Sequence, residues 1–262
     1  MRQISFKLQD KTIILSGTFN HQMQNMATTL TSLGADVALI GPSAQEARRF
    51  CDNLNDAREI NSSFGRSLVI ESSLDSESSV QEAVSRTAES FGGLDALIDS
   101  RMLSRHPKSF SQSSSQEMME TFQDVLHSTL LITQMALQFI EGRQKGRVIF
   151  VLHDSWRWAL PGEELSSVFR SCLQQLTKTL AQEITEKNIT VNALAVGVTE
   201  EFLLQRYPKS GSAELALKEL KAHCPSARMV DAQDISHLVA FLASPLSSAI
   251  NGQVLTAHGG WI

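Results

Sequence analysis

The sequence has few of the residues that build metal sites or disulfide frameworks. Its three cysteines, Cys51, Cys172 and Cys224, lie far apart among 262 residues and form no CxxC pair. This spacing favours neither a zinc site nor a disulfide scaffold, so we expect buried or idle thiols and no metal. Tyrosine is scarcer still, because Tyr207 is the single one in the chain. A mechanism that needs a phenol therefore has one candidate.

Long runs of one charge and long apolar runs are also missing. The net charge is -5, and neither sign is gathered into a stripe that could follow a phosphate backbone. Nucleic acid is therefore not an expected partner. No stretch approaches the length of a membrane span, and the first residues contain no apolar signal core. We expect a soluble, cytoplasmic protein without a membrane partner.

What the chain does contain is a regular alternation of short apolar runs and amphipathic stretches. With 42% hydrophobic residues, a chain of this length buries one large core, so we expect a single domain over residues 1–262. The predicted strands are Thr12–Leu15, Asp36–Ile40, Leu68–Ile70, Leu94–Ile98, Arg147–Leu152, Ile189–Val196 and Gly252–Thr256. The predicted helices are Gln22–Leu33, Ala44–Leu54, Ser79–Phe91, Met118–Ile140, Leu165–Glu186 and Ile235–Ala243. This order is typical of an α/β fold, a doubly wound Rossmann-type sheet of about seven parallel strands with helices on both faces.

Several segments resemble landmarks of one protein family, in the right order along the chain. The last 32 residues, DAQDISHLVAFLASPLSSAINGQVLTAHGGWI, are similar to the closing segment of the short-chain dehydrogenases/reductases. LDALI, GRVIF and ITVNALAVG resemble the fourth, fifth and sixth strands of that family. The resemblance covers essentially the whole chain and implies the doubly wound fold, but function has to be argued from the site.

The resemblance implies a cofactor loop that is altered here. In the family, the first strand ends in TGxxxGxG, whose glycines let the backbone approach the pyrophosphate of a nicotinamide cofactor. The matching residues are Ser16–Met23, and Gly17 is the only one of the motif glycines that remains. His21 and Met23 replace the others, and we expect their side chains to project where a phosphate needs bare amides. Dinucleotide binding should then be poor or absent.

Other positions that hold the cofactor in the family are altered too. They are Gly41 and Pro42 after the second strand, Ser73 after the third, Asp99, Ser100, Arg101 and Met102 after the fourth, and Val196 and Gly197 after the sixth. Gly41 and Pro42 offer no side chain that could bind a ribose hydroxyl or phosphate. We therefore expect no cofactor, and NAD(P) only if this interpretation is wrong.

The family's catalytic groups are a tyrosine, a lysine four residues later, a serine on the fifth strand and an asparagine on the preceding helix. By the resemblance, these positions fall on Ser166, Arg170, His153 and a residue near Val125 or Leu126. An aliphatic hydroxyl cannot replace a phenol as a proton donor near neutral pH, and arginine stays charged. Losing such an acid lowers a rate by about 10² to 10⁴. We therefore predict no catalytic residue.

Alternative activities on the same fold stay open. Arg170 beside an altered glycine loop resembles the halohydrin dehalogenases, although those enzymes keep the serine and tyrosine that are missing here. His153 could instead act as a base for a Ser166 nucleophile, with Asp99 or Asp154 orienting the imidazole. No GxSxG motif supports that chemistry. A weak NAD(P)-dependent oxidoreductase is the remaining alternative.

Family members usually assemble through two long helices and the last strand. Here Phe122–Ile140 has more apolar surface than one contact with a sheet uses, and Leu165–Glu186 is the second such helix. We therefore expect a homo-oligomer, a dimer or tetramer, or a hetero-oligomer with an active paralogue. Trp156 and Trp158 indicate a ligand pocket or an interface. A complete core beside an altered site predicts a catalytically silent pseudoenzyme, a binding or scaffold subunit.

Overall fold

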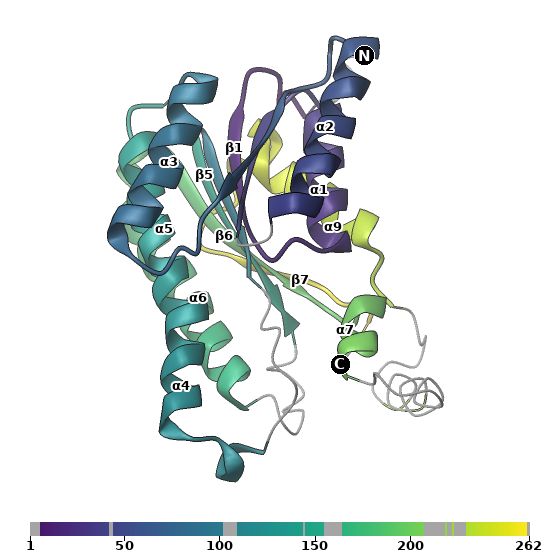
Figure 1. Ribbon diagram of the computed structural model, residues 1–262. Helices are drawn as coiled ribbons and strands as arrows, with labels where there is room; N and C mark the ends of the chain where they lie inside the picture. Colours follow the sequence, from purple (N-terminus) through teal and green to yellow (C-terminus); the bar gives the residue numbers. More distant parts are fainter. Residues whose placement is uncertain are drawn as a thin grey trace.

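The fold is one parallel sheet covered by helices on both faces. The computed structural model describes residues 6–41, 44–101, 109–143, 145–154, 164–206 and 229–260, with the single residues 218 and 222. The strands are β1 (Thr12–Gly17), β2 (Asp36–Gly41), β3 (Ser67–Glu71), β4 (Ala96–Ser100), β5 (Gly146–His153), β6 (Ile189–Val196) and β7 (Val254–Ala257). Their order is β3-β2-β1-β4-β5-β6-β7, and all neighbouring strands pair in parallel (Figure 1). The predicted doubly wound α/β fold is confirmed.

The helices divide between the two faces of the sheet. They are α1 (His21–Ser32), α2 (Ala44–Ile60), α3 (Glu77–Phe91), α4 (Ser115–Thr121), α5 (Ser128–Ile140), α6 (Glu164–Glu183), α7 (Glu200–Arg206) and α9 (Ala232–Ala243). Helices α3, α5 and α6 pack on one face, and α1, α2 and α9 pack on the other (Figure 1). Alternate residues of β1 serve both cores, since Ile14 faces the first set and Ile13 and Leu15 face the second. A strand buried on both faces has to be apolar throughout, as these residues are.

Several element boundaries differ from the predicted ones. Helix α2 continues to Ile60, six residues beyond the predicted end. The predicted single helix Met118–Ile140 is divided into α4, a π-helix η2 (Phe122–His127) and α5. Strand β7 starts at Val254 because Gly252, with φ +69°, still belongs to the turn before it. Short 3₁₀ turns complete the chain: η1 (Phe110–Gln112), η4 (Thr185–Lys187) and η5 (Pro245–Ser247).

The position of any ligand site follows from the order of the strands. The chain runs outward from β1 to β3 in one direction and from β4 to β7 in the other, so the order reverses between β1 and β4. Open α/β sheets bind ligands in the crevice at the carboxyl ends of the strands beside such a reversal. Gly17 and Ser100 are the last residues of these two strands and are direct partners in the sheet. The site is therefore expected around them.

No helix among the described residues is long and apolar enough to cross a membrane.

Candidate active site

The turn after β1 depends on a glycine. Gly17 has φ +139°, and a Cβ atom there would lie 2.4 Å from the Ser100 carbonyl oxygen. A second glycine supports the same approach, because a Cβ at Gly41 would lie 2.5 Å from the carbonyl oxygen of Gly17. Gly41 therefore allows the ends of β1 and β2 to come together, and a side chain at this position would require them to shift.

Helix α1 begins beside this turn and places its first residues at the carboxyl edge of the sheet. Its N-cap is Asn20, whose side-chain oxygen accepts a hydrogen bond from the Met23 amide at 2.8 Å. The Met23 side chain is 2% exposed and packs against the sheet. The expectation that Met23 projects into the phosphate position is wrong, because this helix position faces the core. Gln22 is also buried and donates to the Ser100 hydroxyl at 3.3 Å, whereas His21 is exposed.

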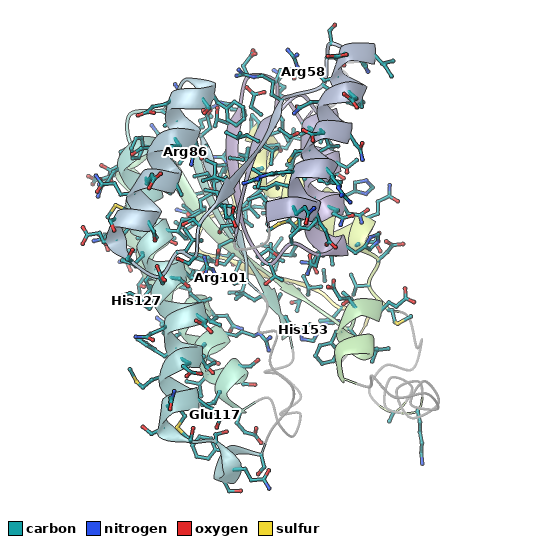
Figure 2. All side chains as sticks on the ribbon, in the orientation of Figure 1. Arg58, Arg86, Arg101, Glu117, His127 and His153 are labelled. Atoms are coloured by element: carbon teal, nitrogen blue, oxygen red, sulfur yellow. The ribbon has the colours of Figure 1, made fainter. Side chains whose placement is uncertain are left out.

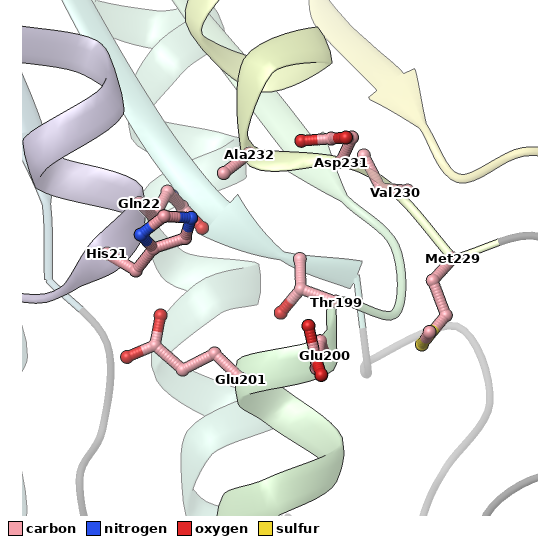
Figure 3. A pocket seen from close by; sticks show the side chains of 9 residues that line it. All are labelled: His21, Gln22, Thr199, Glu200, Glu201, Met229, Val230, Asp231 and Ala232. Atoms are coloured by element: carbon pink, nitrogen blue, oxygen red, sulfur yellow. The ribbon is translucent and has the colours of Figure 1, made fainter. Parts of the chain in front are cut away.

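A cleft of about 440 Å³ lies between the amino end of α1 and the segment that follows β6 (Figure 3). Its lining residues are His21, Gln22, Thr199, Glu200, Glu201, Met229, Val230, Asp231 and Ala232. Thr199 caps helix α7, since its hydroxyl accepts a hydrogen bond from the Phe202 amide at 3.2 Å. Acidic residues are favoured in the first turn of a helix, which suits Glu200 and Glu201.

Glu201, which was not predicted from the sequence, reaches from α7 to the start of α1. Its carboxyl group is hydrogen-bonded to the Asn20 side chain and interacts favourably with the charge of His21. Figure 3 shows Glu201 beside His21 in the cleft. Burial raises the pKa of Glu201 above its usual value, and these two contacts oppose the rise. The sequence signal was a threonine followed by two glutamates after the sixth strand, but that pattern indicates only a helix start.

A buried carboxylate joins the ends of β1 and β4 to α5. Asp99 is 2% exposed and accepts hydrogen bonds from the hydroxyl groups of Ser16 and of Thr129, the latter at 2.7 Å. The Arg101 Nε atom lies 3.5 Å from an Asp99 oxygen and balances its charge. These groups, and not His153, surround the Asp99 carboxylate, so the suggestion that Asp99 orients the His153 imidazole is not supported.

Arg101 also holds the irregular helix that precedes α5. The position expected for the family's asparagine, near Val125, lies in the π-helix η2 (Phe122–His127). Arg101 Nη1 donates to the Asp124 carbonyl oxygen at 3.1 Å and to the Ser128 hydroxyl at 2.6 Å, and that hydroxyl donates to the same carbonyl at 2.6 Å. π-Helices occur often at functional sites. The structure thus has an irregular helix at the position expected for the asparagine.

The three family positions that we assigned from the sequence are all buried. His153 ends β5 and is 3% exposed, and Ser166 and Arg170 on α6 are each 6% exposed. The imidazole stacks on the Phe202 ring, with 4.0 Å between centroids and 23° between planes. Figure 2 shows His153 at the end of β5. Burial lowers the pKa of His153 well below its usual value, and the nearby Arg170 charge lowers it further. His153 is therefore neutral in the folded protein at neutral pH.

This neutral histidine makes stability depend on pH. Because the pKa of His153 is lower in the folded chain than its value of about 6.5 in the unfolded chain, the unfolded chain binds the extra proton first. The stabilisation is fully present above pH of about 6.5 and is lost as the pH falls below it, by up to about 1.4 kcal/mol per pH unit. Urea unfolding of wild type and His153→Phe at pH values above and below about 6.5 checks this dependence of stability on pH. Equal pH slopes in both proteins would contradict a neutral His153.

Several residues named from the sequence lie outside the described residues. They are Pro42, Met102, Trp156, Trp158, Tyr207 and Cys224. Of the other cysteines, Cys172 is exposed and Cys51 is buried, and burial raises the pKa of Cys51 to about 11. The Cys51 thiol therefore stays protonated and unreactive at neutral pH.

Comparison with known proteins places these features in context. The family model described as Enoyl-(Acyl carrier protein) reductase matches residues 24–262. The chain is 27% identical to the 3-oxoacyl-[acyl-carrier-protein] reductase FabG of Aquifex aeolicus, over 98% of this chain and 99% of the relative. It is 24% identical to the NADPH-dependent aldehyde reductase-like protein, chloroplastic, of Arabidopsis thaliana, over 97% of this chain and 95% of the relative.

Two solved structures have closely similar folds. A dehydrogenase/reductase from Sinorhizobium meliloti 1021 matches with a TM-score of 0.84 at 25% identity, covering 98% of this chain and 96% of the other. A short chain dehydrogenase from Burkholderia cenocepacia J2315 in complex with NADP matches with a TM-score of 0.84 at 24% identity, covering 97% and 98%.

These relationships contradict two expectations from the sequence. The prediction of a silent binding or scaffold subunit is wrong, because relatives that cover the whole chain are named as reductases. The prediction that no cofactor is expected is wrong as well, since relatives and a structural neighbour are named with NADPH or NADP. The physical error lay at Met23, which was taken to fill the phosphate position but is packed in the core.

Proposed function

Because the chain belongs to the short-chain dehydrogenase/reductase family, we propose that it is an oxidoreductase that uses NAD or NADP to reduce a carbonyl compound. The observation that carries this proposal is the cleft beside the start of α1, at the edge of the sheet where open α/β folds bind ligands. The relatives supply the chemistry, because they are named for the reduction of 3-oxoacyl groups and aldehydes.

The described residues fit the phosphate-bearing part of a nicotinamide dinucleotide. Gly17 allows the turn after β1 to pack against the Ser100 carbonyl, just before the start of α1. The amides of His21 and Gln22 open α1, and such amides have no partner within a helix. His21 and Gln22 line the cleft, so the positive end of the helix dipole lies beside it and favours an anion. These groups would hold the phosphates.

The bound nicotinamide would supply a hydride, and the chain would orient the carbonyl that receives it. None of the described residues at the family's catalytic positions is a phenol. Ser166 can donate a hydrogen bond, and Arg170 stays charged at every working pH. We propose that they polarise the carbonyl oxygen, and that the alkoxide formed by hydride transfer takes its proton from solvent water. Since a missing general acid lowers a rate by about 10² to 10⁴, we propose a slow enzyme.

Nucleotide binding and turnover test the proposal directly. Thermal unfolding is measured with NADH and with NADPH, because a ligand at a hundred times its dissociation constant adds about 2.7 kcal/mol of stability. Oxidation of the nucleotide that binds is then followed with a 3-oxoacyl thioester, an aldehyde and an enoyl thioester. We expect a higher melting temperature with one nucleotide and slow oxidation with one carbonyl substrate. The absence of any shift with both nucleotides would refute the proposal.

The assembly and location expected from the sequence remain proposals. Met119 on α4, Leu130 on α5 and Val168 on α6 are 54%, 38% and 57% exposed, which supports an oligomer built through this side of the molecule. Light scattering during gel filtration tests it, and a monomer at all concentrations would contradict it. A cytoplasmic location is tested by cell fractionation.

A further inference from the structure

The carboxylate of Glu201 lies at the phosphate-binding end of helix α1, although it comes from another helix. Glu201 is in the first turn of α7, and its carboxyl group interacts with the Asn20 side chain. Asn20 is the N-cap of α1, and its side-chain oxygen is already used by the Met23 amide. The Asn20 amide group therefore links the start of α1 to an anion that belongs to the protein itself.

This place is also where an incoming anion would bind. His21 and Gln22 of the first turn of α1 line the same cleft as Glu201, so the positive end of the helix dipole lies beside this carboxylate. His21, the first residue of α1, interacts favourably with the Glu201 charge. A phosphate at the same helix end would need the same partners and would meet a negative charge already there.

We propose that Glu201 is a built-in competitor for the phosphates of the nucleotide, so that its carboxylate must move away or lose its charge before the nucleotide binds. The inference rests on the proposed function and names the residue that sets nucleotide affinity in that same cleft. Glu201 is half-buried, and the Thr199 cap fixes the helix turn that holds it. The carboxylate is thus positioned by the fold and not by chance contact of a free side chain.

The other charged groups of the cleft do not compensate for Glu201. Glu200 on α7 and Asp231 before α9 are both acidic, and His21 on α1 is the remaining titratable group that lines the space. Asp231 is held by its role as the N-cap of α9, where it accepts a hydrogen bond from the Gln233 amide at 3.0 Å. An anionic ligand therefore meets a surplus of negative charge, and Glu201 is the carboxylate linked to the helix end.

The competition depends on pH. Burial raises the pKa of Glu201, while the Asn20 hydrogen bond and the His21 charge oppose this rise without cancelling it. As the pH falls, Glu201 therefore takes up a proton earlier than an ordinary glutamate would. Loss of its charge removes the repulsion, so nucleotide affinity is expected to rise as the pH falls from about 8 to about 5. The effect of Glu201 is isolated by comparing variants.

Calorimetric titration of wild type, Glu201→Gln and Glu200→Gln with NADH, NADPH and inorganic pyrophosphate tests the inference. Both variants remove one negative charge from the cleft and keep the side-chain shape, and Glu201 is the residue shown to interact with Asn20 and His21. We expect Glu201→Gln to lower the dissociation constant of the nucleotide by about tenfold at pH of about 8, and Glu200→Gln by less than about threefold. The advantage of Glu201→Gln should shrink at pH of about 5.

The outcomes separate this inference from the proposed function. If a nucleotide binds wild type and Glu201→Gln equally well, the inference is overturned and the proposed function stands. If no nucleotide binds either protein but pyrophosphate binds Glu201→Gln more tightly, the competition stands and the proposed function fails. If neither a nucleotide nor pyrophosphate binds more tightly to Glu201→Gln than to wild type, the inference that Glu201 competes with the phosphates is overturned. The same holds if Glu200→Gln increases the affinity as much as Glu201→Gln does.

Discussion

Replacing Gly17 with alanine is expected to lower the free energy of unfolding by about 3 to 5 kcal/mol and to abolish nucleotide binding. Two effects add. The backbone has φ +139°, which residues with a side chain rarely adopt, and the new Cβ atom would lie 2.4 Å from the Ser100 carbonyl oxygen. Relief of that clash has to separate β1 from β4, where the ligand crevice begins. Urea unfolding and a thermal shift with NADPH measure the two losses.

Gly142→Ala is the matched control for backbone strain. Gly142 has φ +93°, but a Cβ atom there would meet nothing within 4 Å. Only the cost of the left-handed backbone remains, about 1 to 2 kcal/mol, and nucleotide binding should be unchanged. If Gly17→Ala is no less stable than Gly142→Ala, the close approach of β1 and β4 does not constrain the turn. If it still binds nucleotide normally, Gly17 is not part of the site.

The sheet was predictable because strands buried on both faces have to be apolar along their whole length. Ile13, Ile14 and Leu15 are all buried, and the predicted strand Ile189–Val196 agrees with β6 at both ends. Helix ends were harder to predict, because their residues are exposed and apolar spacing then gives no signal. Helix α2 reaches Ile60, whose side chain is 90% exposed. A π-helix has no known spacing of apolar residues, so η2 was taken for part of a regular helix.

The site was less predictable than the fold because a position in a motif does not tell which way its side chain points. The sequence matches Met23 to a family glycine, but its side chain packs in the core and leaves the cleft open. Contacts between distant segments are also invisible in one sequence. Neither the approach of Glu201 to Asn20 nor the hydrogen bond from Thr129 to Asp99 follows from local pattern.

Asp99→Leu is expected to cost about 3 to 5 kcal/mol of folding free energy, because it leaves a largely buried charge without its partner. The side chain of Arg101 is 13% exposed, and Asp99 is the carboxylate that balances it among the described residues. The hydroxyl groups of Ser16 and Thr129 lose their acceptor at the same time. Asp99→Asn keeps the shape and an acceptor oxygen but removes the charge, so it should be less destabilising. Urea unfolding measures both.

The double variant Asp99→Leu with Arg101→Met separates the loss of the pair from the burial of an unpaired charge. Removing both charges leaves no buried ion, and replacement of such a pair by apolar side chains is often neutral or stabilising. The double variant should therefore be more stable than Asp99→Leu alone, although the contacts of Arg101 with Asp124 and Ser128 are lost. If the two substitutions add without coupling, the guanidinium is solvated well enough without Asp99. In that case the link between β4 and the π-helix would depend on the Asp124 carbonyl and the Ser128 hydroxyl, and not on the ion pair.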